Sequence, residues 1–271
     1  MSGRSDFSVK KQGVVLVLVV AIGAASCGRA ERPAGPIAKN GGMAAARVKP
    51  GVQVFLEKHL DLVEGKRVGL ITNPTGVDGL LRSTIDLFLA SPAIKLVALY
   101  GPEHGVRGNA QAGEHVPFTM DEKYNLPMFS LYGQSFKPDP GMLKNIDAYM
   151  RSFDTKESGK VPEAAMVDGI DVMIFDIQDV GTRVYTYVAT MAYAMQAAAE
   201  SGIDFVVLDR PNPVNGVDME GPVLEYPEFS SFIGLFPIPE RHGMTAGELA
   251  GLFNDKFLAR KARLTVVPVD G

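Results

Sequence analysis

Short apolar runs alternate along the chain with segments of helical periodicity. The apolar runs predict strands at residues 67–73, 95–100, 127–132, 172–177, 205–208 and 264–269. Helical spacing and capping signals predict helices at residues 50–60, 80–90, 139–153, 185–200 and 245–257. Strands that are apolar along almost their whole length, and that helices separate, are typical of a parallel sheet covered on both faces. The predicted fold class is therefore α/β.

The first 48 residues have a different pattern. Basic residues precede an apolar run at 14–22, and small residues follow at 23–26, which is the order of a secretory signal peptide. Cys27 stands directly after Ala-Ala-Ser, in a pattern similar to the lipobox of bacterial lipoproteins. The Gly-, Ala- and Pro-rich residues up to 48 predict a flexible tether. We expect a signal peptide at 1–26, a lipidated Cys27 with its tether at 27–48, and a protein exported to the cell envelope and anchored by lipid. A buried thiol at Cys27 is the alternative.

Composition and missing motifs limit the classes of partner and cofactor that we expect for this protein. The 271 residues carry a net charge of -4, so the chain has no excess of positive charge with which to bind phosphates, and nucleic acid is not an expected partner. Cys27 is the only cysteine, which excludes an intrachain disulfide. The sequence contains no G-x-G-x-x-G fingerprint after its first strand, no P-loop and no G-x-S-x-G elbow. We therefore expect no cofactor.

Polar segments follow the predicted strands. In an open α/β sheet, the loops at the carboxyl ends of the strands converge on a crevice where ligands bind. Four such segments are Asn73-Pro74, Gly101 to Gly105, Asp176 to Tyr187 and Asp209 to Pro213. A fifth, Arg241 to Thr245, precedes a helix start, where free backbone N–H groups favour an anion. We expect the five segments to line one site.

Glu103 lies on a tight bend between Gly and Pro residues, beside His104. A general acid must keep its proton near neutral pH, and desolvation at the floor of a crevice favours this. We therefore interpret Glu103 as a candidate general acid or nucleophile. A solvated acid beside a capping imidazole is the alternative interpretation.

Asp176 lies within an apolar strand, where an unpaired carboxylate would be costly. Its expected partner is Arg183 or Arg210. Asp176 is therefore as readily a structural or site-orienting residue as a catalytic one, and the same ambiguity applies to Asp179 and Asp209.

A metal centre is a further possibility. The pair Glu103-His104 recurs as Glu114-His115, and nearby aspartates offer more oxygen ligands. The chain contains neither His-x-x-x-His nor a Cys ligand spacing. We therefore predict no metal, with metal-dependent catalysis as the alternative.

Five sequence blocks together resemble one known family. They are G-P-E-H-G at 101–105, F-D-I-Q-D-V-G-T-R-V-Y-T-Y at 175–187, L-D-R-P-N-P at 208–213, M-E-G-P at 219–222 and P-E-R-H-G-M-T-A-G-E-L-A at 239–250. In this order they are similar to blocks of the NamZ-type exo-β-N-acetylmuramidases, a glycoside hydrolase family formerly described as a domain of unknown function. The resemblance covers about residues 50–271.

The resemblance implies an enzyme of peptidoglycan turnover that removes non-reducing terminal N-acetylmuramic acid from cell-wall fragments. It also implies a Rossmann-like catalytic domain at 49–271 with the acid at Glu103, and a smaller C-terminal domain that is missing from this chain. Residues 154–168 look like an insertion relative to the family pattern. A non-catalytic, lipid-anchored muropeptide-binding protein and a metal-dependent cell-wall hydrolase are the alternative functions.

The chemistry of that substrate separates the candidate residues into catalytic and saccharide-binding ones. A glycosidase needs an acid and usually a second carboxylate, so the catalytic candidates are Glu103, His104, Asp176 and Asp179, with Glu114 or Glu220 as alternatives for the second carboxylate. The lactyl carboxylate of N-acetylmuramic acid needs a cation, and the candidates are Arg183, Arg210 and Arg241. The residues predicted to bind peptidoglycan-derived saccharide are Asn73, Arg107, Glu114, Gln178, Arg183, Tyr185, Asp209, Arg210, Asn212, Glu220, Arg241 and His242.

Overall fold

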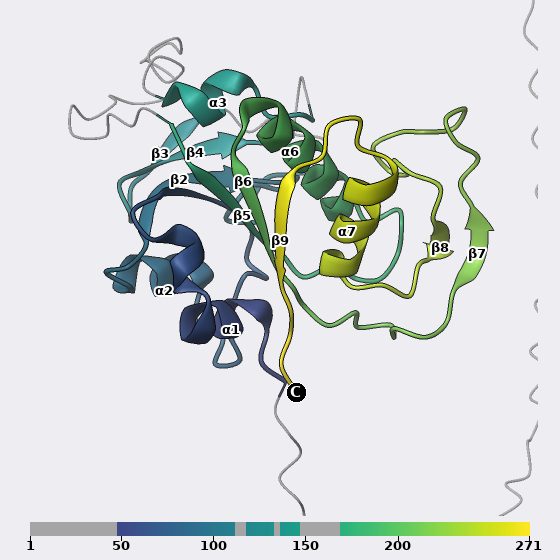
Figure 1. Ribbon diagram of the computed structural model, residues 1–271, viewed down its shortest axis with the longest axis horizontal. Coiled ribbons are helices and arrows are strands. Elements are labelled where there is room, and N and C mark those ends of the chain that lie inside the picture. Colours follow the sequence, from purple (N-terminus) through teal and green to yellow (C-terminus); the bar gives the residue numbers. More distant parts are fainter. Residues whose placement is uncertain (1–47, 112–117, 133–135, 147–168) are drawn as a thin grey trace, which may run out of the picture. The chain divides into compact units, whose positions relative to one another are not determined.

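The computed structural model describes residues 48–111, 118–132, 136–146 and 169–271 (Figure 1). The predicted signal peptide, Cys27 and all but the last residue of the tether lie outside these ranges. Glu114 and the insertion predicted at 154–168 also lie outside them. What the sequence predicts for these segments stays a prediction.

A seven-stranded sheet forms the centre of the described chain (Figure 1). In the order in which they lie side by side, its strands are β3 (Thr119–Asp121), β4 (Leu126–Ser130), β2 (Lys95–Gly101), β1 (Arg67–Thr72), β5 (Val172–Asp176), β6 (Asp204–Leu208) and β9 (Arg263–Val267). β3 is antiparallel to β4, and the other neighbouring pairs of this sheet are parallel. The six predicted strands are confirmed. The sequence pattern does not predict β3, because three residues are too few to show an alternation.

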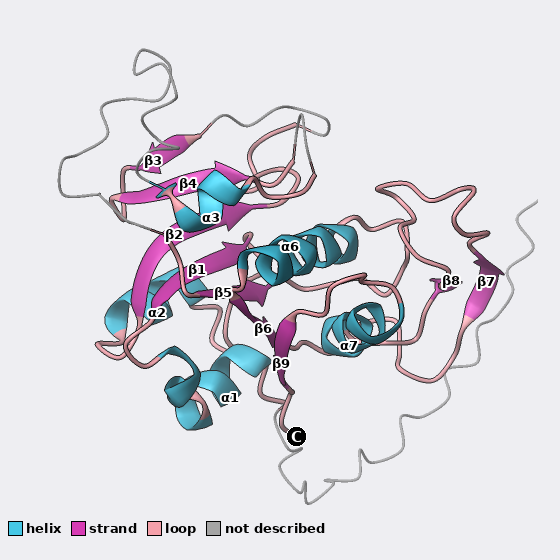
Figure 2. Cartoon of the chain, turned by 45° about the horizontal axis from the view of Figure 1, so that its top comes forward, coloured by secondary structure: helices cyan, strands magenta, loops and turns pink. Residues whose placement is uncertain are grey.

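Helices cover both faces of the sheet. α1 (Gly51–Lys58), the short 3-10 helix η1 (Leu60–Val63) and α2 (Thr84–Ala90) pack on one face. α3 (Pro140–Lys144), α6 (Tyr187–Ser201) and α7 (Ala246–Lys256) pack on the other (Figure 1, Figure 2). Alternate residues of a strand point to opposite faces. The β5 residues Val172 and Ile174 therefore join the core with α1 and α2, whereas Met173 and Phe175 join the core with α6. The predicted α/β fold is confirmed.

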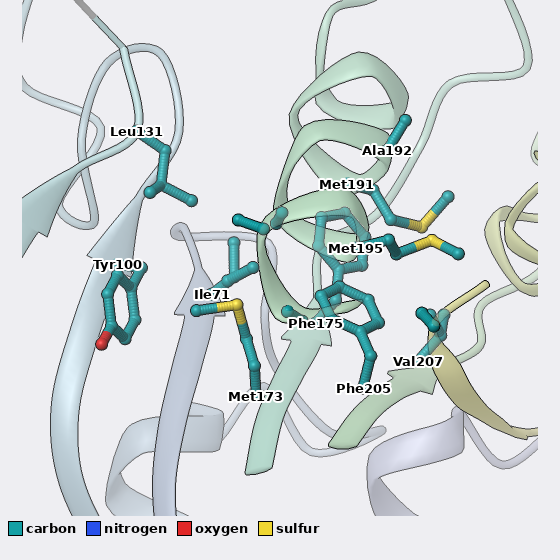
Figure 3. Close-up of a cluster of buried hydrophobic side chains, with 14 of the residues drawn as sticks. Ile71, Tyr100, Leu131, Met173, Phe175, Met191, Ala192, Met195, Phe205 and Val207 are labelled. Atoms are coloured by element: carbon teal, nitrogen blue, oxygen red, sulfur yellow. The ribbon is translucent and has the colours of Figure 1, made fainter. Parts of the chain in front are cut away.

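α6 packs on the middle of the sheet. Its Met191 and Met195 lie near Phe175, Phe205 and Val207, which project from β5 and β6 (Figure 3). These side chains are fully buried or nearly so, and burial of each large apolar side chain stabilises the fold by about 1.5–3 kcal/mol. Because α6 follows β5 in the chain, this packing holds the first turn of the helix at the carboxyl edge of the sheet.

The helix predicted at 80–90 begins four residues later than expected. α2 starts at Thr84 and is capped by the side chain of Ser83. Leu80 and Leu81 precede it and are 62% and 81% exposed. Asp78 Oδ1 accepts hydrogen bonds from two backbone N–H groups of this segment and holds it as a turn. Such side-chain hydrogen bonds to the backbone compete with helix formation, which explains the difference.

Two more elements differ from the prediction. α3 ends at Lys144, because Asn145 has a φ of -144°, outside the helical region, and residues 147–153 of the predicted helix lie outside the described ranges. β7 (Glu220–Val223) and β8 (Pro239–Arg241) form a separate antiparallel pair beyond α7 (Figure 1). The pattern does not predict this pair, because β7 contains Gly and Pro and is exposed along its length.

The N-cap residues predicted for α3 and α7 are confirmed. Asp139 accepts a hydrogen bond from the N–H of Gly141 at 2.7 Å, with proline at the first helical position. Thr245 and Glu248 form a capping box at the start of α7. Of the described helices, none has the length and apolarity needed to cross a membrane.

The strand order places a topological switch point between β1 and β5. From β1 the chain adds β2 and β4 on one side, and it returns to place β5, β6 and β9 on the other side. This is the Rossmann order of strands, in which the loops after the two central strands diverge and leave a crevice at their carboxyl ends. Thr72 and Asp176, the last residues of β1 and β5, are partners in the sheet at this switch point.

Candidate active site

Glu103 lies two residues beyond β2, at the carboxyl edge of the sheet, and is half-buried. Its Oε2 accepts a hydrogen bond from Thr186 Oγ1 at 3.0 Å, and the Tyr132 hydroxyl also donates to its carboxylate. Burial and the neighbouring Glu103 raise the pKa of Tyr132, which keeps that hydroxyl protonated. Segments that follow β2, β4 and β5 therefore converge on one carboxyl group.

The bend that carries Glu103 depends on close backbone approach. A Cβ at Gly101 would lie 2.7 Å from the backbone nitrogen of Val106, so only glycine fits there. His104 has a positive φ of 70°, and its Nδ1 lies 3.0 Å from the carbonyl oxygen of Ala110. Because a carbonyl can only accept, Nδ1 carries the proton in this contact, and Nε2 of the neutral ring is left as an acceptor.

Asp176 forms a buried ion pair at the switch point. Both of its oxygens contact the Arg210 guanidinium, with Nε to Oδ1 at 2.7 Å and Nη2 to Oδ2 at 3.0 Å. Thr84 Oγ1 donates to Oδ2, and Arg210 also donates to the carbonyl of Val77 at 2.8 Å. The side chains of Asp176 and Arg210 are 0% and 5% exposed. Of the two partners expected for Asp176, the structure selects Arg210, and these contacts join the ends of β5 and β6.

Asp179 and His242 form a second buried pair. His242 Nδ1 accepts a hydrogen bond from the backbone N–H of Met244 at 3.2 Å, so the proton of the neutral ring is on Nε2. Nε2 lies 3.3 Å from Asp179 Oδ2, which also accepts from the N–H of Gly181 at 2.8 Å. Asp179 Oδ1 is buried and has no hydrogen-bond partner among the described residues. One carboxylate oxygen of this pair is therefore unused within the described part of the chain.

Asp209 anchors the start of α7. Its oxygens accept hydrogen bonds from the backbone N–H groups of Arg210 at 2.9 Å and Gly247 at 2.8 Å, and from Thr245 Oγ1 at 2.7 Å. Burial raises the pKa of Asp209, which these hydrogen bonds partly oppose. Asn212, from the same segment, donates to the carbonyl of Met244 at 2.9 Å. Both side chains connect the loop after β6 to the start of α7.

Arg183 is held within the protein. Its Nη1 donates to the carbonyl oxygens of Pro222 at 2.8 Å and Ile238 at 2.6 Å, and its Nη2 lies 3.2 Å from Glu240 Oε2. These contacts tie the loop after β5 to β7 and β8. Arg183 is thus engaged by backbone and carboxylate groups of this chain.

Arg241 has partners that face solvent. Its guanidinium pairs with Glu220 at 2.8 Å and with Asp218 at 3.6 Å, and these two carboxylate side chains are 66% and 61% exposed. Its Nε is buried without a hydrogen-bond partner among the described residues. Such exposed pairs contribute little to stability.

The remaining predicted residues also make contacts within the chain. Asn73 Oδ1 accepts from the N–H and hydroxyl of Thr75 at 2.9 Å and 2.6 Å, and Gln178 Nε2 donates to the carbonyls of Asp179 and Pro211. The backbone N–H of Gln178 also donates to Thr75 Oγ1 at 2.9 Å, and with this bond the contacts connect the loops after β1, β5 and β6.

The last two predicted residues, Arg107 and Tyr185, make contacts of a different kind. Arg107 pairs with Asp121 at the end of β3, and its guanidinium lies 4.9 Å from the centroid of the Tyr124 ring. Burial raises the pKa of Tyr185 to about 12, and its ring packs edge-on against Tyr187.

Three site residues are missing from the sequence prediction. Thr84 and Thr186 supply hydroxyl donors to Asp176 and Glu103, and Tyr132 contacts Glu103 from the end of β4. Tyr132 ends a predicted strand, so the rule that selected the other loops could have found it. Hydroxyl side chains are common in loops, and their spacing along the chain does not show which carboxylate they will meet.

Within the described ranges, no three His, Cys, Asp or Glu side chains come together as metal ligands. The pair Glu114-His115, on which the metal hypothesis depends in part, lies outside those ranges.

Comparison with known proteins identifies the family. The family described as "Exo-beta-N-acetylmuramidase NamZ, N-terminal" matches residues 68–159 and 150–271. The chain belongs to the NamZ family. All five sequence blocks quoted above lie within the matched ranges, so the resemblance they indicate is confirmed.

Individual relatives agree with membership of the NamZ family. The chain is 51% identical over 234 residues to the peptidoglycan β-N-acetylmuramidase NamZ of Bacillus subtilis strain 168, an alignment that covers 86% of this chain and 50% of that protein. Two crystal structures of DUF1343 family proteins from Bacteroides fragilis NCTC 9343 are 45% and 33% identical, with TM-scores of 0.69 and 0.63. Each alignment covers 83% of this chain, and 50% and 53% of the respective structures. The chain therefore spans about half the length of these relatives.

Proposed function

We propose that this protein is an exo-acting glycoside hydrolase that releases non-reducing terminal N-acetylmuramic acid from peptidoglycan fragments. The observation that carries the proposal is the placement of Glu103 at the carboxyl edge of a Rossmann-type sheet, oriented by Thr186 and Tyr132. The 51% identity to a peptidoglycan β-N-acetylmuramidase supplies the substrate class. Glu103 would protonate the glycosidic oxygen as the bond to the leaving sugar breaks.

A second group would complete the reaction, and the contacts favour Asp179. Both oxygens of Asp176 are occupied by Arg210, and Glu220 is exposed on β7. Asp179 instead keeps Oδ1 without a partner among the described residues, while its Oδ2 accepts a hydrogen bond from the N–H of Gly181 and lies 3.3 Å from His242 Nε2. We assign Asp179 as the second carboxylate. His104 directly follows Glu103 in the sequence, and its Nε2 is a further hydrogen-bond acceptor.

Arg241 is the proposed ligand of the lactyl carboxylate. Arg183 and Arg210 are bound to carbonyl and carboxylate groups inside the protein, whereas the acidic partners of Arg241 are largely exposed. Arg241 also forms a backbone bridge with Thr182, on the loop that leads to Thr186 and hence to Glu103. A planar guanidinium at this place suits bidentate binding of a carboxylate.

The direct test is release of sugar from a defined disaccharide. We expect the protein to release N-acetylmuramic acid from MurNAc–GlcNAc, equally with and without EDTA, as measured by liquid chromatography with mass spectrometry. The reversed disaccharide GlcNAc–MurNAc, which has N-acetylglucosamine rather than N-acetylmuramic acid at its non-reducing end, should stay intact and serves as the control. Loss of release in EDTA alone would favour a metal-dependent hydrolase, and binding of the disaccharide without release would favour a muropeptide-binding protein.

We also propose that the protein is exported and lipid-anchored through Cys27. The signal-like order of residues 1–26 and the small residues before Cys27 support this. In a bacterial host, wild-type protein should carry a lipid detectable by mass spectrometry and should fractionate with membranes. Cys27→Ser protein should lack the lipid, and an unmodified thiol on mature wild-type protein would refute the anchor.

A further inference from the structure

Four half-buried aromatic side chains gather beside Glu103. Tyr132 follows β4, Phe136 precedes α3, Tyr193 lies on α6, and Phe232 lies between β7 and β8. The rings of Phe136 and Phe232 stack with centroids 4.1 Å apart. The Phe232 centroid also lies 5.6 Å from that of Tyr132 and 6.4 Å from that of Tyr193. Phe232 is therefore the central ring of the cluster.

Local hydrogen bonds fix the backbone at or beside two of these aromatic residues. Ser130 Oγ accepts from the backbone N–H of Tyr132 at 3.1 Å and donates to its carbonyl at 2.7 Å. The backbones of Ser231 and Gly234 exchange two hydrogen bonds, at 2.9 Å and 3.1 Å, so Phe232 lies at the tip of a tight turn. Side chains on a backbone that is fixed in advance lose less conformational entropy when they bind a ligand.

The cluster is continuous with the candidate acid. The Tyr132 hydroxyl donates to Glu103 while its ring joins the cluster. Thr186, at the N-cap of α6, donates to the same carboxylate. Tyr193 follows Thr186 by seven residues, which places it on the same side of the helix and about 10 Å further along its axis. A ligand that reaches Glu103 would therefore have an aromatic surface next to it.

We propose that Tyr132, Phe136, Tyr193 and Phe232 form a platform that binds the N-acetylglucosamine on the leaving-group side of the scissile bond. The inference rests on the proposed function, because it takes Glu103 as the group that protonates the oxygen between the two sugars. A pyranose ring has apolar C–H groups on its faces and hydroxyls at its edge, which match aromatic faces bordered by tyrosine hydroxyls.

The charge of each sugar determines which of the two the platform would bind. Neither phenylalanine nor a protonated tyrosine carries charge, so the four rings offer no cation to a lactyl carboxylate. The proposed ligand of that carboxylate, Arg241, lies on β8, outside the cluster. N-acetylglucosamine is neutral and needs no such partner. Burial raises the pKa of Tyr193 as well, so this ring also stays neutral. N-acetylmuramic acid then lies on the other side of Glu103.

The test is a pair of binding constants measured with the free sugars. N-acetylglucosamine and N-acetylmuramic acid are titrated separately into wild-type protein and the Phe232→Ala variant, with binding followed by NMR. We expect Phe232→Ala to weaken N-acetylglucosamine binding about 5- to 30-fold, as loss of one aromatic contact and its buried area implies, and to change N-acetylmuramic acid binding less than twofold. Phe232→Leu, which keeps apolar bulk but has no ring, should behave like Phe232→Ala if both melt near the wild-type temperature.

Phe229→Ala is the matched control, because Phe229 is three residues away in the same segment and 60% exposed. It should leave both constants unchanged. Absence of N-acetylglucosamine binding to the wild type, equal weakening of both sugars, or wild-type affinity in Phe232→Leu would overturn the proposal. Binding does not require turnover, so Phe232-dependent binding without hydrolysis would support the platform and contradict the hydrolase. Hydrolysis with Phe232-independent binding would do the reverse.

Discussion

Glu103→Gln should reduce release of N-acetylmuramic acid from MurNAc–GlcNAc by about 100- to 10,000-fold, the range that a general acid contributes. The amide keeps the shape of the side chain and can still accept the Thr186 hydrogen bond, but it has no proton to give to the glycosidic oxygen. Initial rates over a range of disaccharide concentrations would show the loss in kcat. Retention of more than a tenth of wild-type activity would remove Glu103 from the acid role.

A second substrate separates a proton donor from a residue with another role. An N-acetylmuramide of 2,4-dinitrophenol has a leaving group that departs without protonation, so Glu103→Gln should lose far less activity on it than on the disaccharide. Equal loss on both substrates would indicate a nucleophile or a positioning residue instead. Glu122→Gln, at an exposed acid next to β3, is the control and should match the wild type on both substrates.

Asp176→Asn should lower the free energy of unfolding by about 3–5 kcal/mol, the usual cost of breaking a buried ion pair from one side. The substitution leaves the Arg210 guanidinium, which is 5% exposed, without a compensating charge at the switch point of the sheet. Urea unfolding followed by circular dichroism would measure the change. Wild-type stability combined with lost activity would instead assign Asp176 to the chemistry.

Two further variants show whether the loss of stability in Asp176→Asn comes from the buried charge pair. Glu57→Gln removes an ion pair with Lys49 in which both side chains are more than 40% exposed, and it should cost less than about 1 kcal/mol. Asp176→Leu combined with Arg210→Met replaces the buried pair by apolar groups and should recover much of the stability that Asp176→Asn loses. A double variant as unstable as the single one would show that the hydrogen bonds to Thr84 and Val77, rather than the charge pair, stabilise this region.

The difference between prediction and structure is greatest where side chains meet across the chain. In the sequence, Arg183 and Arg210 are equal candidates as partners of Asp176, since both follow strands that end at the same edge. The structure pairs Asp176 with Arg210 and turns Arg183 towards the carbonyls of Pro222 and Ile238. Sequence spacing gives the loop on which a side chain lies, but not its direction, because direction depends on packing against segments that are distant in the chain.

The α/β class, six of the seven strands of the main sheet and the bend that presents Glu103 can be predicted from the amino-acid sequence. Continuous apolar runs, helix caps and glycines act through local backbone preferences and burial, which a single stretch of chain reveals. Three features are visible only in the folded chain: the strand order, the buried pairs of Asp176 and Asp179, and the contact of Glu103 with Thr186 and Tyr132. Those features arise from long-range pairing, in which the closeness of two side chains is set by how the strands are ordered in the sheet.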